Sequence, residues 1–101
     1  MTIQEIKTAL KISIISEEID QEISNLVEEA ILDLTETADI AKFDLDSADA
    51  FQAGAVRAYV AWKWYLNLGI LEKAERFHQS FDIYKGQMAL SSKYRNHNEE
   101  E

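Results

Sequence analysis

The stretch ADAFQAGAVRAYVAWKWYLNL, residues 48–68, decides the fold, because it is apolar on two opposite sides of a predicted helix. At about 100° per residue, one side collects Phe51, Ala55, Ala58, Trp62, Tyr65 and Leu66. The opposite side carries Ala53, Val56, Val60 and Trp64. A helix that is apolar all round is buried all round. In a chain this short, one side can face the protein's own core, and we expect the other side to need a partner.

Two segments precede this helix in the N-terminal part of the chain. Thr2 and Glu5 form a T-x-x-E capping box, which predicts a helix over about residues 3–11. The β-branched run at 12–16 breaks the helical period. It predicts a short extended linker whose isoleucines dock on the core.

A second helix is predicted up to about Thr37, with Ser16 or Asp20 as its N-cap. Its core side holds Ile19, Ile23, Leu26, Val27, Ala30 and Leu34. Another side holds Glu18, Glu22, Glu29, Asp33 and Glu36. Like charges at i,i+4 cost about 0.2–0.5 kcal/mol per pair. Two interpretations of this acidic side stay open: a hydrated surface, or a surface held for a cationic partner.

Residues 38–47 have weak periodicity and predict a loop. Three of its apolar residues are expected to pin it to the core: Ile40, Phe43 and Leu45. Ser47 is the expected N-cap of the central helix, and Gly69 follows that helix in the usual C′ position.

The last helix is predicted over about residues 70–94, with a core stripe. The stripe consists of Leu71, Ala74, Phe77, Phe81, Tyr84 and Met88. The candidate protein-interface residues are Ile83, Leu90 and Tyr94 on its opposite side, together with Val56, Val60 and Trp64. The expected fold is an all-α bundle of about four helices over residues 1–95, followed by a disordered acidic tail, NHNEEE, at 96–101.

Composition excludes several classes of protein. The chain has no cysteine, which rules out disulfides, thiolate zinc sites and cysteine nucleophiles. No apolar run approaches the roughly 20 residues of a membrane span, so we expect a soluble protein without a membrane partner. No G-x-S-x-G elbow or glycine-rich phosphate loop is present. Nothing argues for an enzyme or a cofactor.

Charge is distributed unevenly along the chain, whose net charge is −9. Residues 1–50 hold 13 acids and 3 bases, whereas residues 51–101 hold 6 acids and 7 bases. This is a poor composition for a nonspecific nucleic-acid binder. The asymmetry permits head-to-tail contact between copies, although acids that only keep a small domain soluble are the alternative.

A metal site and an aromatic surface are the two remaining sequence signals. Glu75 and His78 form one E-x-x-H pair, whereas a ferritin-like dinuclear site needs two. A histidine at the edge of the core is the alternative for His78. Trp and Tyr are enriched at protein interfaces. We expect Trp62 to pack inside and Trp64 to contact a helix outside the primary core, in the same chain or the next.

The order of elements resembles a known family. IQEIKTALKIS opens the chain, DQEISNLVEEAILDL follows, and AVRAYVAWKWYLN and ERFHQSFDIYKGQMALSSKY come after a loop. This pattern, over about residues 3–94, is similar to the small head–tail connector proteins of tailed bacteriophages, also called adaptor or head-completion proteins.

The resemblance implies an α-helical structural protein of the virion, assembled in the bacterial host cytoplasm. Such proteins form a ring, commonly of twelve subunits, beneath the portal protein, and the ring receives a stopper or tail-completion protein. DNA passes through the channel without specific binding, and an acidic excess fits such a channel. The family has no catalytic activity and no cofactor. A small helical adaptor or regulator that binds one partner protein is the competing interpretation.

Overall fold

The computed structural model describes residues 1–13 and 16–95, and within them the chain forms four α-helices and no strand. These are α1 (Ile3–Ala9), α2 (Glu17–Thr37), α3 (Ala50–Asn67) and α4 (Leu71–Leu90). The all-α prediction with about four helices is therefore confirmed. The predicted docking of Ile14 and Ile15 and the predicted tail at 96–101 fall outside the described residues.

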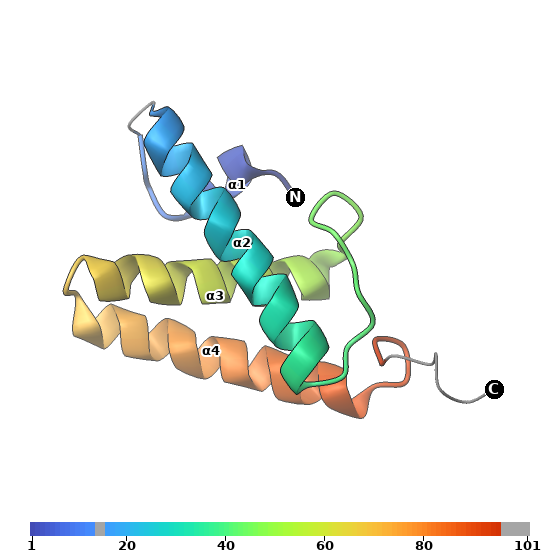
Figure 1. Ribbon diagram of the computed structural model, residues 1–101. Coiled ribbons are helices and arrows are strands. Elements are labelled where there is room, and N and C mark those ends of the chain that lie inside the picture. Colours follow the sequence, from blue (N-terminus) through green and yellow to red (C-terminus); the bar gives the residue numbers. More distant parts are fainter. Residues whose placement is uncertain (14–15, 96–101) are drawn as a thin grey trace.

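α3 and α4 form an antiparallel hairpin, and α2 crosses it (Figure 1). The contact between α3 and α4 is the most extensive in the molecule, followed by that between α2 and α3. α1 is attached to α2 by a much smaller contact. The turn between α3 and α4 lies at the end of the hairpin that α2 does not cover (Figure 1).

The first two helices begin at caps that the sequence predicts. The amide of Glu5 donates to Thr2 Oγ1 (3.2 Å) and the amide of Thr2 donates to Glu5 Oε1 (2.7 Å), which completes the capping box of α1. Ser16, rather than Asp20, caps α2, since its Oγ accepts from the amide of Ile19 at 3.4 Å. Each cap satisfies an amide that has no partner inside its helix.

The cap of α3 differs from the prediction. Asp49 is the N-cap: its Oδ1 accepts from the amide of Gln52 (2.8 Å), and Gln52 Oε1 accepts from the amide of Asp49 (2.9 Å). Ser47 instead donates its hydroxyl to Asp44 Oδ1 at 2.8 Å, in a turn before the helix. Ser47 is therefore wrong as the cap, because a carboxylate two residues later forms a reciprocal pair with Gln52.

Gly69 ends α3 as predicted. Its φ of +78° lies in the left-handed region, which glycine adopts without steric cost. The amide of Gly69 donates to Leu66 O (3.1 Å) and that of Ile70 to Tyr65 O (3.0 Å), the bonds of a Schellman motif. The chain is thereby turned back sharply into α4.

α4 ends at Leu90, four residues before the predicted end. Ser91 is extended, and the chain folds back so that the amide of Ala41 donates to Tyr94 O at 2.7 Å. Tyr94 Oη donates to Asp49 Oδ2 at 2.9 Å. Residues 91–95 therefore fasten the α2–α3 connection to the start of α3, instead of continuing the helix.

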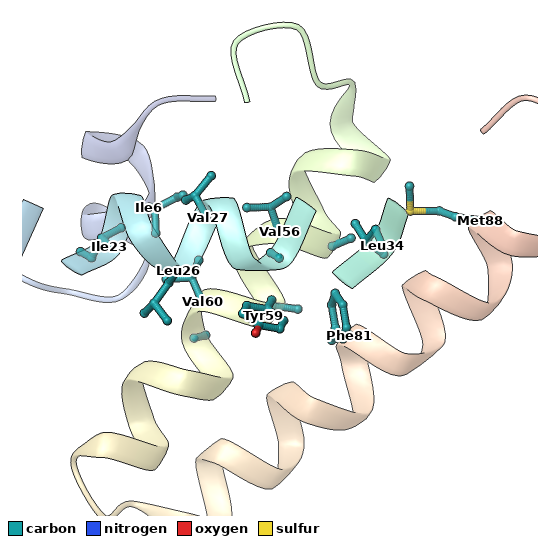
Figure 2. Close-up of a cluster of buried hydrophobic side chains, with 14 of the residues drawn as sticks. Ile6, Ile23, Leu26, Val27, Leu34, Val56, Tyr59, Val60, Phe81 and Met88 are labelled. Carbon is teal, nitrogen blue, oxygen red and sulfur yellow. The ribbon is translucent and has the colours of Figure 1, made fainter. Parts of the chain in front are cut away.

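The hydrophobic core gathers side chains from all four helices (Figure 2). Its labelled members are Ile6, Ile23, Leu26, Val27, Leu34, Val56, Tyr59, Val60, Phe81 and Met88. α2 packs over the side of α3 that carries the two valines, and both valines are fully buried. A helix that is apolar on two sides is thus covered on one side by α4 and on the other by α2.

Candidate interaction surfaces

Three of the six candidate interface residues belong to the protein's own core. Val56 and Val60 are 0% exposed, and Tyr94 is 8% exposed with its ring centroid 5.7 Å from that of Phe51. The prediction that these side chains await a partner is wrong, because α2 packs over the valines and Tyr94 folds back onto the start of α3. Trp64 is half-buried and packs against the same core, so its contact lies within the chain.

The other two candidates lie on the surface of α4. Ile83 is 60% exposed and Leu90 is 88% exposed. Their positions opposite the core stripe agree with the sequence pattern. They remain candidates for contact with another protein.

A further apolar surface lies at the α3–α4 turn, which we call the hairpin tip. Its residues are Leu66 (45% exposed), Leu68 (57%), Ile70 (42%) and Leu71 (65%). Leu66 and Leu71 were expected in the core, and this expectation is wrong because α2 crosses the hairpin farther along (Figure 1). The signal in the sequence was the leucine and isoleucine on both sides of Gly69, since residues beside a tight turn have few neighbours to cover them.

Stacked rings join the two helices next to the hairpin tip. The Trp62 and His78 rings lie parallel, with centroids 3.9 Å apart and an interplanar angle of 2°. The Tyr65 and Phe77 rings stack at 5.7 Å and 10°. Trp62 is therefore only partly enclosed, at the edge of the core rather than inside it.

Cationic side chains accompany these rings. Lys63 Nζ lies 4.2 Å from the Trp62 ring centroid, and Lys73 Nζ lies 5.1 Å from that of Tyr65. Lys73 and Arg76 also line a shallow depression of about 170 Å³ next to Tyr65. The region of the hairpin tip is thus apolar with a basic rim.

In the described residues, the fold does not support the hypothesis that Glu75 and His78 bind a metal. The His78 ring is stacked on Trp62, and its Nε2 lies 3.6 Å from Asp82 Oδ2. Across residues 1–13 and 16–95, no three or more acidic or histidine side chains come together as a possible metal site. Glu75 instead accepts a hydrogen bond from Gln79 at 3.3 Å.

A groove runs between α2 and the connection that follows it, and we call it the α2 groove. Its volume is about 450 Å³, and it is lined by Glu28, Ile31, Leu32, Thr35, Lys42, Phe43 and Asp44. Leu32 is 54% exposed there. The hydroxyl and then the amide of Ser47 donate to Asp44, which lowers the pKa of that carboxyl. Sequence patterns missed this groove because it needs two segments brought together.

Part of the acidic side of α2 has partners inside the chain. Lys85 Nζ on α4 lies 2.8 Å from Asp33 Oδ1. Tyr59 Oη donates to Glu29 Oε1 at 3.2 Å, and Asn67 Nδ2 donates to Glu22 Oε2 at 3.4 Å. The cationic partner of this side is therefore supplied, at Asp33, by the protein's own α4.

Comparison with protein-family models, with curated proteins and with solved structures finds no match to this chain. In the described part of the chain, no helix is both long and apolar enough to cross a membrane. The assignment of a function therefore depends on the residues and surfaces of this chain.

Proposed function

We propose that this protein is a structural adaptor of a tailed bacteriophage, a ring subunit between the portal protein and a stopper or tail-completion protein. The observation that carries the proposal is the amount of apolar surface left open on a small domain. Seven large apolar side chains are more than two-fifths exposed in the described residues: Leu32, Leu66, Leu68, Ile70, Leu71, Ile83 and Leu90.

The distribution of these side chains supports assembly into a ring. They lie on α2, at the hairpin tip and along α4, rather than in one patch. A ring subunit uses different surfaces for its two neighbours, because a heterologous contact joins one patch to a different patch. A further surface then remains for the portal, and Ile83 and Leu90 on α4 are suited to it.

The proposed role needs neither catalysis nor a cofactor. In this role the protein forms a ring around a channel through which DNA slides. The family resemblance implies about twelve copies in the ring. The net charge of −9 supports such a lumen, since a surface that bound phosphates would hold the DNA back.

Electron microscopy of the protein mixed with a candidate portal protein tests this proposal. A stacked ring on the portal is the expected result. The double variant Ile83→Asp/Leu90→Asp should abolish the ring, whereas Gln21→Asp, at an exposed position near the start of α2, should leave it intact. A wild-type protein that stays monomeric or dimeric with every portal supplied contradicts the proposal.

The second candidate function is a small helical adaptor or regulator that binds one partner protein. The exposed hairpin tip favours it as well, because a single apolar surface with a basic rim is enough for one contact. Sizing separates the two candidates, since this protein would form a complex of fixed low stoichiometry and no ring.

A further inference from the structure

The hairpin tip and the α2 groove have complementary chemistry. The tip carries four exposed leucine and isoleucine side chains, and Lys73 and Arg76 lie beside it. The groove offers Ile31, Leu32 and Phe43 as its apolar lining. Burying apolar surface from both sides removes it from water, which is the main favourable term in protein association.

The charges of the two surfaces have opposite signs. Residues 57–76, which contain the tip, hold four bases and two acids. Residues 28–46, which contain the groove, hold seven acids and one base, Lys42. Glu28 and Asp44 stand at the groove itself. Such complementarity steers association and fixes which surface meets which.

The two surfaces cannot meet within one molecule. The tip follows the last residue of α3, whereas the groove is formed by α2 and the connection that leads to the first residue of α3. α3 has 18 residues, so its ends are about 27 Å apart. Figure 1 shows the tip and the α2–α3 connection at opposite ends of the hairpin.

We propose that the hairpin tip of one copy docks in the α2 groove of a second copy, with Leu68 and Leu71 against Leu32 and Phe43. Lys73 of the first copy then lies near Glu28 of the second. Because the two patches differ, the first copy keeps its groove free and the second copy keeps its tip free, so the contact can repeat head to tail. This contact rests on the proposed ring and names the surfaces that join its neighbours.

Cysteine cross-linking tests the contact directly, because the natural chain has no cysteine. Leu32→Cys and Leu71→Cys replace exposed side chains, and circular dichroism verifies that each variant folds. The two variants are mixed at high concentration and oxidised, and each is also oxidised alone. A disulfide joins the pair only if the two sulfur atoms come within bonding reach.

A mixed dimer formed several-fold more than either homodimer is the expected result. Gly86→Cys is the control, since this position on α4 is exposed and a side chain there has open space. Homodimers of Leu71→Cys that outnumber the mixed dimer would mean tip-to-tip contact and overturn the proposal. The proposal would also be overturned if the mixed dimer of Leu32→Cys and Leu71→Cys formed no more than the mixed dimers that either variant forms with Gly86→Cys.

A charge exchange adds a second readout. Lys73→Glu in the Leu71→Cys chain should lower the yield of the mixed dimer several-fold, by placing a carboxylate near Glu28. Glu28→Lys in the Leu32→Cys chain should restore it. If neither substitution changes the yield of the mixed dimer, Lys73 does not lie near Glu28 and the proposed contact is refuted.

The outcome separates this contact from the proposed function, because no portal protein is present. If a ring forms on the portal but Leu32→Cys and Leu71→Cys do not cross-link, the proposed contact is refuted while the connector role stands. Cross-links from a protein that no portal binds would support the contact and leave the connector role without support.

Discussion

Tyr59 has an unusual environment for a phenol. Its hydroxyl donates to Glu29 Oε1 at 3.2 Å, and its ring packs edge-on against Phe81 at 5.1 Å between centroids. Burial, followed by the negative charge of Glu29, raises the pKa of Tyr59 from 10.0 to about 12. The phenolate is disfavoured because it would be desolvated beside a carboxylate.

The titration of Tyr59 gives a testable pH dependence. Between pH 10 and about 12 the folded protein holds a proton that the unfolded chain has released. The contribution of Tyr59 to stability is therefore complete below pH 10 and is lost as the pH rises toward 12. Phenolate absorbance of wild type minus that of Tyr59→Phe should have its midpoint near 12. A midpoint near 10 would contradict this environment.

Two helical glycines form a matched pair with opposite expectations. A Cβ on Gly86 meets open space, whereas a Cβ on Gly54 would lie 2.7 Å from Tyr84 Oη and 2.8 Å from Tyr84 Cζ. Gly86→Ala should raise the free energy of unfolding by about 0.5–1 kcal/mol. Gly54→Ala should lower it, because the Tyr84 ring must move away from its contact with Phe51. Urea unfolding compares them, and equal stabilisation by both would refute the close approach.

The crossing of α2 over α3 decides which apolar residues are core and which are surface. Val60 lies under α2 and is fully buried, while Ile83 on α4 is 60% exposed. Both looked like candidate interface residues in the sequence. The difference between them arises from packing of one helix on another and can be measured in the isolated protein.

Removal of methyl groups at the two positions should have unequal effects. Val60→Ala deletes two buried methyl groups and leaves a cavity, so it should lower the free energy of unfolding by about 2 kcal/mol. Ile83→Ala should change it by less than about 0.5 kcal/mol. Urea denaturation of both variants checks this. Similar small losses at both positions would mean that α2 does not cover α3 in solution.

Local chemistry made several of the helix ends predictable from the sequence, although not the end of α4. Thr2 with Glu5, Ser16 and Gly69 act through hydrogen bonds or backbone angles that involve only near neighbours. Ser47 failed because Asp49 offered a stronger reciprocal pair with Gln52. The core stripe of α2 was also predictable, except that Ile19 is only partly buried.

Tertiary placement limited what could be predicted of the surfaces. A helical wheel shows that Val56 lies on an apolar side of α3, but it does not show which helix covers that side. The sequence therefore led to the wrong prediction that this side needs a partner. The wheel also placed Leu71 in a core stripe, although the hairpin extends beyond α2 at that point. The α2 groove combines Leu32 and Phe43 from separate segments, and no periodicity in one segment reveals it.

The molecule as a whole has a strong hairpin and a weakly attached first helix. α1 has seven residues and is held by Ile6, Leu10 and the buried amine of Lys7, which lies 2.8 Å from Asp20 Oδ1. An isolated helix this short is not stable in water. The stability of α1 therefore depends almost entirely on these contacts.

Native-state hydrogen exchange should separate these regions. We expect amides of α1 to open at a free energy at least about 2 kcal/mol below that of amides in the middle of α3, because α1 has few buried contacts. Asp20→Asn should lower the protection of α1 further, since Lys7 loses its charged partner, and should leave α3 unchanged. Identical opening energies in α1 and α3 would show a single cooperative unit and contradict this.

The parallel pair of Trp62 and His78 gives the molecule a built-in optical reporter. The emission of an indole depends on the groups in contact with its ring, and here an imidazole lies parallel to it with 3.9 Å between centroids. Anything that separates the ends of α3 and α4 parts the rings and changes the emission. A partner that binds at the neighbouring turn and moves these helix ends can thus be followed by fluorescence, without attaching a dye to the surface under study.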